Sequence, residues 1–133
     1  LTGLGGSPSQ AGLIAIDGAT AAATSIALGV PLRTSSPSER LVVHEASGKV
    51  LVRLESQVVI VDGQRGSPTR NTVVAVLPVG RENGAADLAI DQELGIAVTI
   101  GSFDFRADVI DINSNTVTHT VPLTSFGQDV AID

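Results

Sequence analysis

The stretch Ala86–Asp91 reads ADLAID, and near the C-terminal end of the sequence Gln128–Asp133 reads QDVAID. The two stretches start at positions 86 and 128, so they lie 42 residues apart. Self-similarity at a period of about 20–50 residues is typical of solenoids, propellers and other repeat arrays. The sequence therefore predicts a fold built of repeated units.

Each unit contains four short runs rich in β-branched and apolar residues, separated by turn residues, which is the pattern of β-strands. One unit has predicted strands over Leu88–Ile90, Ile96–Ile100, Asp108–Ile112 and Thr116–Leu123. The preceding unit has predicted strands over Leu41–Val43, Val50–Leu54, Val58–Val61 and Thr72–Val79. A longer connection, Asp62–Asn71, stretches the spacing of these units to 47 residues, from position 41 to position 88. Loops accept such insertions at small cost.

Partial units flank the two complete ones. Leu13–Asp17 and Ala23–Leu28 match the last two strands of an earlier unit, and Val130–Ile132 opens a later one. A short helix over Ala21–Leu28 is the alternative for one of these segments, because alanine favours helices. The predicted organisation is a loop or linker over 1–10, a trailing half-unit and connector over 11–40, units over 41–87 and 88–129, and a first strand over 130–133.

Several motifs recur in a fixed order along these units. They are Ala97-Val98-Thr99-Ile100, Val109-Ile110-Asp111, Asn115-Thr116-Val117 and, in the preceding unit, the run NTVVAVLPVG at residues 71–80. Together they resemble the YVTN-type β-propeller repeat, which is found in surface-layer-type proteins. The resemblance implies an all-β fold made of β-propeller blades, each with four antiparallel strands.

A four-stranded blade cannot bury both of its faces alone, so blades stack around a central channel. A propeller usually needs about four to eight blades to close, and this sequence supplies two complete units with parts of two more. We therefore expect an incomplete ring in this chain. It would be completed as a segment of a larger propeller, by copies of itself, or as an open stacked array. We favour the segment, because ragged ends leave strand edges unpaired.

The amino-acid composition excludes several classes of partner and of chemistry. With 43% hydrophobic residues and a net charge of −6, the chain is expected to be globular and not disordered. Its eight Lys and Arg residues are scattered among fourteen Asp and Glu, which argues against a nucleic-acid partner, because such surfaces need clustered basic charge. The absence of cysteine excludes disulfides, thiolate catalysis and Cys-ligated zinc in this chain.

The most apolar run, residues 12–30, is interrupted by Asp17 and by several polar residues. A spanning helix needs about 20 predominantly apolar residues, so no membrane span is predicted. The sequence starts at Leu1 and contains no Met, and we therefore expect a processed product or a piece of a longer protein.

The two histidines are weak candidates for chemistry. His44 lies in a predicted turn beside Glu45, where it could transfer a proton or bind a metal, but an exposed turn residue is the simpler interpretation. His119 lies in a predicted strand with no carboxylate at a matching spacing, and we expect it to face solvent.

An acidic cluster suggests an alternative metal site. Asp104, Asp108 and Asp111 lie near Asn113 and Asn115, and their oxygen atoms could bind calcium. The EF-hand spacing is absent. Asp111 is better interpreted as a strand-end residue that bonds the backbone of the following turn. The sequence predicts no catalytic residue, no metal and no cofactor.

The resemblance also implies where a ligand would bind. Ligands of propellers meet the face built by the loops between the fourth and first strands and between the second and third strands. Loops on a rigid scaffold commonly carry function. The candidates on these loops are Arg81, Glu82, Asp104, Arg106 and Phe126.

These observations favour a non-catalytic scaffold or binding module of a secreted, periplasmic or cell-surface protein, which makes protein–protein or surface-layer contacts. Its partner would be another protein or the missing blades of the same propeller, with a homo-oligomer as a further option. One alternative is part of a propeller enzyme of the dehydrogenase or lactonase type, whose active site is completed by residues outside this chain. Another is a structural subunit of an extracellular filament.

Overall fold

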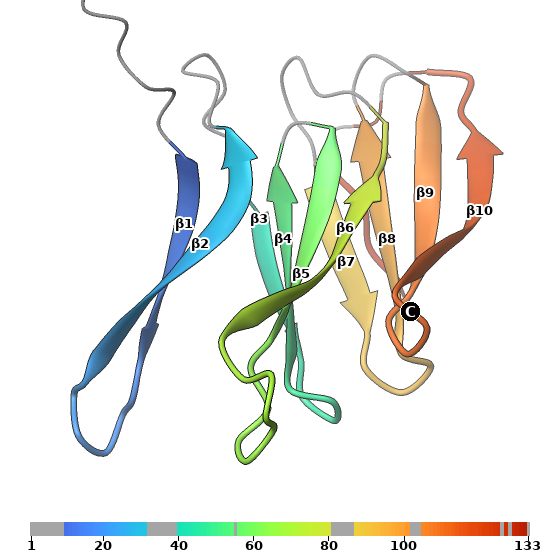
Figure 1. Ribbon diagram of the computed structural model, residues 1–133. Coiled ribbons are helices and arrows are strands. Elements are labelled where there is room, and N and C mark those ends of the chain that lie inside the picture. Colours follow the sequence, from blue (N-terminus) through green and yellow to red (C-terminus); the bar gives the residue numbers. More distant parts are fainter. Residues whose placement is uncertain are drawn as a thin grey trace, which may run out of the picture. The chain divides into compact units, whose positions relative to one another are not determined.

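The computed structural model describes residues 10–31, 40–54, 56–80, 87–101, 105–125, 127 and 129–132. The elements assigned in this part of the chain are all β-strands, and they form one two-stranded sheet and two four-stranded sheets (Figure 1). None of the described residues belongs to a helix that could cross a membrane. The chain divides into two compact units, Leu1–Ser35 and Ser36–Asp133, which are described in turn.

The first unit holds an antiparallel hairpin of β1 (Gln10–Ile16) and β2 (Ala23–Pro31). The helix considered as an alternative over Ala21–Leu28 is therefore wrong. Thr24, Ile26 and Val30 are β-branched, and their stiff side chains fit an extended strand better than a helix. In this hairpin, their preference outweighs the helix propensity of the alanines.

The second unit contains two consecutive meanders, in which each strand pairs with the next along the chain. The first sheet consists of β3 (Arg40–His44), β4 (Lys49–Leu54), β5 (Gln57–Asp62) and β6 (Thr72–Pro78). The second consists of β7 (Asp87–Asp91), β8 (Ile96–Gly101), β9 (Arg106–Asp111) and β10 (Thr116–Pro122). All pairings are antiparallel, which confirms the prediction of four antiparallel strands per unit.

The register places apolar side chains of each sheet on a common face. Leu51 lies opposite Ile60 in the first sheet, and Ala97 lies opposite Ile110 in the second. These residues belong to one buried cluster shared by both sheets, which also contains Val58, Leu77, Val79, Leu88 and Ile112. The two sheets therefore pack face to face, and burial of these aliphatic side chains is the main force that holds them together.

The first strands of the two sheets lie next to each other, since β3 contacts β7. At the start of these strands, Arg40 Nε forms an ion pair with Asp87 Oδ1 at 3.4 Å. Asp87 Oδ2 also accepts a hydrogen bond from Val130 N at 3.1 Å. Residues 130–132, the described part of the strand expected to open the next unit, form no strand here, but this bond holds the backbone at Val130 beside the start of β7.

The hairpins that follow β1, β3, β7 and β9 each have a residue with positive φ at the same position of the turn. After β7, Asp91 Oδ1 accepts hydrogen bonds from Glu93 N and Leu94 N, and Gly95 adopts φ 65°. An aspartate carboxylate that bonds the backbone of its own turn is a common way to start a tight hairpin. The equivalent left-handed positions are Gly48 (φ 66°), Asn115 (φ 56°) and, in the first unit, Ala21 (φ 57°).

Candidate functional site at the loop end of the blades

The two ends of the four-stranded sheets differ (Figure 1). Tight turns join β3 to β4, β7 to β8 and β9 to β10 at one end, and the longer turn 63–71 joins β5 to β6 there. At the other end, called the loop end below, lie the connections β4–β5, β6–β7 and β8–β9. Of the five candidates assigned to loops, the structure describes Arg106, the first residue of β9, which lies at this end. Arg81, Glu82, Asp104 and Phe126 lie outside the described residues.

Beside Arg106, a buried carboxylate organises the loop end. Asp108 is only 2% exposed, and it lies between Thr99 and Thr120 of the neighbouring strands. Asp108 Oδ1 accepts a hydrogen bond from Thr120 Oγ1 at 2.6 Å. Asp108 Oδ2 accepts one from Arg106 Nε at 3.1 Å and one from Gly80 N at 2.8 Å. A buried charge is stable only when paired and fully hydrogen-bonded, and this carboxylate meets both conditions.

The Gly80 backbone is held from two sides. While its N–H donates to Asp108 of the second sheet, its carbonyl oxygen accepts a hydrogen bond from Arg53 Nη2 of the first sheet at 2.6 Å. Arg53 is fully buried. We call Arg53, Gly80, Arg106, Asp108 and Thr120 the Asp108 cluster. The cluster joins the segment after β6, the last strand of the first sheet, to β9, an inner strand of the second sheet.

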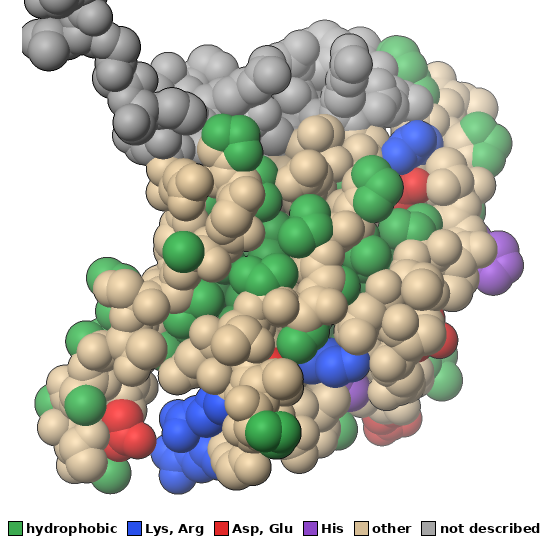
Figure 2. All heavy atoms as spheres, in the orientation of Figure 1, with side chains coloured by type: hydrophobic (Ala, Val, Ile, Leu, Met, Phe, Trp, Pro, Cys, Tyr) green, Lys and Arg blue, Asp and Glu red, His purple; other side chains and the backbone are tan. Residues whose placement is uncertain are grey.

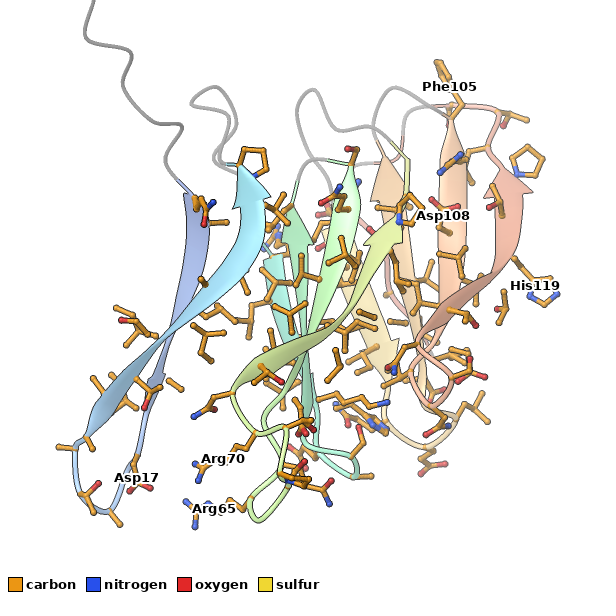
Figure 3. The ribbon with its side chains drawn as sticks, viewed as in Figure 1. Asp17, Arg65, Arg70, Phe105, Asp108 and His119 are labelled. Atoms are coloured by element: carbon orange, nitrogen blue, oxygen red, sulfur yellow. The ribbon has the colours of Figure 1, made fainter. Side chains whose placement is uncertain are left out.

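Arg106 and the residue before it reach the surface. The Arg106 side chain is 35% exposed, although its Nε is fixed by Asp108. Phe105 is 40% exposed, and Figure 3 shows its ring at the loop end, beyond the start of β9. Sequence reasoning placed Phe105 in a loop but did not select it. The missed signal was an aromatic residue next to a strand start in a chain with only three phenylalanines.

His44, at the opposite end, was expected to be an exposed turn residue, and this expectation was wrong. It is only 4% exposed. Its Nε2 donates to the carbonyl oxygen of Gln92 at 3.1 Å, and its Nδ1 lies 2.7 Å from Ser47 Oγ. Because a carbonyl can only accept, Nε2 is the donor in the contact with Gln92. The burial comes from the turn of the second sheet, which no local pattern around His44 reveals.

Two further side chains join the sheets at this end. Gln92 Nε2 donates to Val43 O at 2.7 Å, and its Oε1 accepts from Glu45 N at 2.9 Å. Lys49 Nζ donates to Ile112 O at 2.6 Å and to Asn115 Oδ1 at 2.9 Å. These polar side chains bond the turns of the neighbouring blade, so their role is structural.

Of the three aspartates considered for calcium, Asp104 lies outside the described residues, and the other two do not converge. Asp108 and Asp111 are three residues apart in one strand, so their side chains lie on opposite faces. Asp111 Oδ1 accepts from Asn113 N at 2.7 Å and Ser114 N at 3.1 Å, which confirms its interpretation as a turn residue. These backbone bonds, Ser114 first, lower the pKa of Asp111 below its ordinary 3.8. Among the residues described, no three His, Asp or Glu side chains form a group that could hold a metal ion.

His119, Arg65 and Arg70 lie apart from this cluster (Figure 3). His119 is exposed on β10, as expected, and points away from the sheet in Figure 3. On the face shown in Figure 2, the Lys and Arg side chains form separate small groups among hydrophobic and uncharged ones. Arg65 and Arg70 are exposed in the turn between β5 and β6, far along the strands from the Asp108 cluster (Figure 3).

No protein-family model and no curated protein matches this chain. Solved structures do match it. One is hydrazine synthase from Kuenenia stuttgartiensis, with 18% identity and a TM-score of 0.63 over 89% of this chain and 32% of that one. Another is apo AztD from Citrobacter koseri, with 12% identity and a TM-score of 0.69 over 92% of this chain and 33% of that one. A second AztD structure matches with 13% identity and a TM-score of 0.52, over 86% and 29%.

Both matched proteins contain β-propellers. At these identities the likeness shows the fold alone, and the chain spans about a third of the length of the proteins it matches. The chain is thus all-β and consists of propeller blades of four antiparallel strands that form an incomplete ring. A larger propeller or an oligomer would supply the rest.

Proposed function

We propose that this chain is part of a β-propeller that acts as a non-catalytic scaffold or binding module and contacts a partner protein through its loop end. One observation carries the proposal. The polar side chains buried between the two blades bond the backbone of a neighbouring element, as Arg53 and Asp108 do at Gly80 and His44 does at Gln92. These groups hold the blades together, and Arg106 brings a fixed charge to the surface.

A scaffold of this kind separates stability from recognition. The strands supply a rigid core, and the loops at one end are free to carry contacts. Arg106 takes part in both, since its Nε bonds the buried Asp108 and about a third of its side chain is exposed to a partner. The YVTN-like motifs, which resemble those of surface-layer-type proteins, support a secreted, periplasmic or cell-surface location. The partners in this proposal are a protein at the loop end and further blades, or copies of this chain, that complete the ring.

A second candidate function is part of a propeller enzyme whose active site is completed outside this chain. The match to hydrazine synthase favours it, because that name describes an enzyme. In this case Arg106 would bind substrate next to catalytic groups contributed by other blades. Loss of a chemical turnover in Arg106→Gln, with partner binding intact, would favour the enzyme.

The test expresses the tagged whole protein in its source organism, crosslinks it chemically, and isolates it from the medium, the envelope and the cytoplasm. We expect to find the protein outside the cytoplasm and crosslinked to a partner protein. The Arg106→Gln variant should no longer be isolated with this partner. Arg70→Gln, which removes an exposed arginine at the opposite end, is the matched control and should retain it. Equal retention by both variants, or a cytoplasmic location, would contradict the proposal.

A further inference from the structure

The arginine at the loop end is held ready for a partner. A free arginine side chain loses considerable rotamer entropy when it binds. Here Arg106 Nε already bonds Asp108 Oδ2 at 3.1 Å. Asp108 is itself fixed by Gly80 N and Thr120 Oγ1, so the carboxylate that orients the guanidinium cannot swing away. Much of the ordering cost of Arg106 is therefore met before any partner arrives.

The geometry of a guanidinium decides what such a residue binds. The bond to Asp108 uses Nε, and the two Nη groups of a guanidinium are further paired donors, for which Asp108 is not the acceptor. Two parallel N–H donors fit the two oxygens of a carboxylate. Because 35% of the side chain is exposed, this fork can reach a carboxylate outside the protein.

The neighbouring Phe105 supplies an apolar surface at a cost in backbone strain. Its φ is 47°, a left-handed value that is a genuine outlier for a bulky residue. Its carbonyl oxygen accepts a hydrogen bond from Leu123 N at 2.5 Å, which holds the peptide in place. Glycine or asparagine would adopt this conformation with less strain. Strained residues concentrate at binding sites, and this one projects an aromatic ring that is 40% exposed.

We infer that Phe105 and Arg106 form an anchor pair that binds a protein segment in which a carboxylate side chain lies next to an aliphatic one. The carboxylate pairs with the Nη groups of Arg106, and the aliphatic side chain packs on the Phe105 ring. Arginine and aromatic residues are enriched at the energetic centres of protein interfaces. The inference rests on the proposed function, since it names the kind of partner that the loop end contacts.

The charge of the chain favours a protein segment over a polyanion. With a net charge of −6, the chain repels nucleic acids and other densely charged polymers. A protein segment with a single carboxylate adds little repulsion. Its carboxylate makes the bidentate contact with Arg106, and its apolar side chain makes the contact with the Phe105 ring. Inorganic phosphate could engage Arg106 but would leave Phe105 unused.

Titration of the isotope-labelled 133-residue chain, followed by NMR, tests the anchor pair. The probe is the blocked peptide N-acetyl-Leu-Glu-Leu-amide, and its matched control is N-acetyl-Leu-Gln-Leu-amide. We expect saturable shifts of the Phe105 and Arg106 amides and of the Arg106 Nε–H with the Glu peptide, with a dissociation constant of about 1–10 mM. The Gln peptide should bind at least about fivefold more weakly, as expected for loss of a bidentate charged contact.

Two variants separate recognition from folding. Arg106→Gln should raise the dissociation constant of the Glu peptide about fivefold or more, while Arg70→Gln should leave it unchanged. Phe105→Gly should keep the fold, because glycine adopts the left-handed conformation without strain, and should weaken binding of the Glu peptide. A variant that still melts cooperatively but binds the peptide more weakly separates recognition from folding.

Several results would overturn the anchor pair. They are the absence of saturable shifts at Phe105 and Arg106, equal binding of the Glu and Gln peptides, and inorganic phosphate binding as tightly as the Glu peptide. If these occur while the whole protein still retains its partner through Arg106, the anchor pair is wrong and the proposed function stands. If the partner is also retained by Arg106→Gln, the proposed function itself fails.

Discussion

Carboxylates at strand ends account for much of the local order in this chain. Asp62 closes β5, where its side chain accepts hydrogen bonds from Ser67 Oγ at 2.5 Å, Thr69 Oγ1 at 2.7 Å and Gln64 N at 2.8 Å. The hydroxyls of Ser67 and then Thr69 are the main causes that hold the pKa of Asp62 below its ordinary 3.8. One charged residue thus shapes the long turn that stretches the repeat.

The lowered pKa of Asp62 predicts how stability depends on pH. The folded state binds the Asp62 proton less readily than the unfolded chain, so this stabilisation is complete above the unfolded pKa of 3.8 and is lost as pH falls through the lower folded pKa. Asp62→Asn should be less stable at pH 6 by about 1–2 kcal/mol, and the difference should shrink below pH 3.8. Thermal melts from pH 6 to pH 2 measure it. Glu93→Gln, an exposed turn variant, serves as control, and a difference independent of pH would contradict the prediction.

Ala21 occupies a turn position that its side chain disfavours. Its φ of 57° corresponds to Gly48, Gly95 and Asn115 in the other turns. A left-handed conformation costs an L-residue about 1–2 kcal/mol, and glycine avoids this cost. Part of the gain is offset, because glycine also raises the conformational entropy of the unfolded chain. Ala21→Gly should therefore stabilise the hairpin by about 0.5–1 kcal/mol. Amide hydrogen exchange at β1 and β2 measures this change. Ala22→Gly, where φ is not positive, should be neutral or destabilising, and a gain there as large as at Ala21 would refute the explanation.

At the scale of elements, the junction between blades depends on Asp108. Removing this carboxylate leaves the buried Gly80 N–H and Thr120 hydroxyl without their acceptor, and Arg106 without its ion-pair partner. Leaving a buried hydrogen-bonding group without its partner typically costs about 1–3 kcal/mol, so Asp108→Ala should lose stability of this order. Denaturant unfolding gives the value. Asp129→Ala, which removes an exposed aspartate, should change little, and a similar small effect at Asp108 would show that the cluster does not join the blades.

The strands were predictable from sequence because each one alternates or carries β-branched runs between turn residues. Thr72–Val79 and Ile96–Ile100, for example, match β6 and β8 within one or two residues. The burial of His44 and Asp108 was not predictable, because it is created by the neighbouring sheet and leaves no trace in the adjacent sequence. Arg106 was selected from the position of its loop, whereas the left-handed Phe105 beside it lacks the Gly or Asn that usually announces such a conformation.

At the scale of the whole molecule, the second sheet has two faces and the first sheet covers one of them. Val98 and Val109 lie opposite each other on the other face and are half-buried. A blade with an apolar outer face needs a neighbour. We expect the purified chain to be either a monomer of low thermal stability or a closed oligomer that Val98→Lys dissociates. Analytical ultracentrifugation with thermal melts distinguishes them, and a highly stable monomer would contradict the incomplete ring.

The two four-stranded sheets stack as neighbouring propeller blades, with one apolar core between them. Methyl–methyl nuclear Overhauser effects test it most directly, because they report distances across the shared core of the folded chain. We expect cross-peaks between Leu51, Val58 or Ile60 of the first sheet and Ala97 or Ile110 of the second. Methyl contacts confined within each sheet, with none between the two groups, would contradict it.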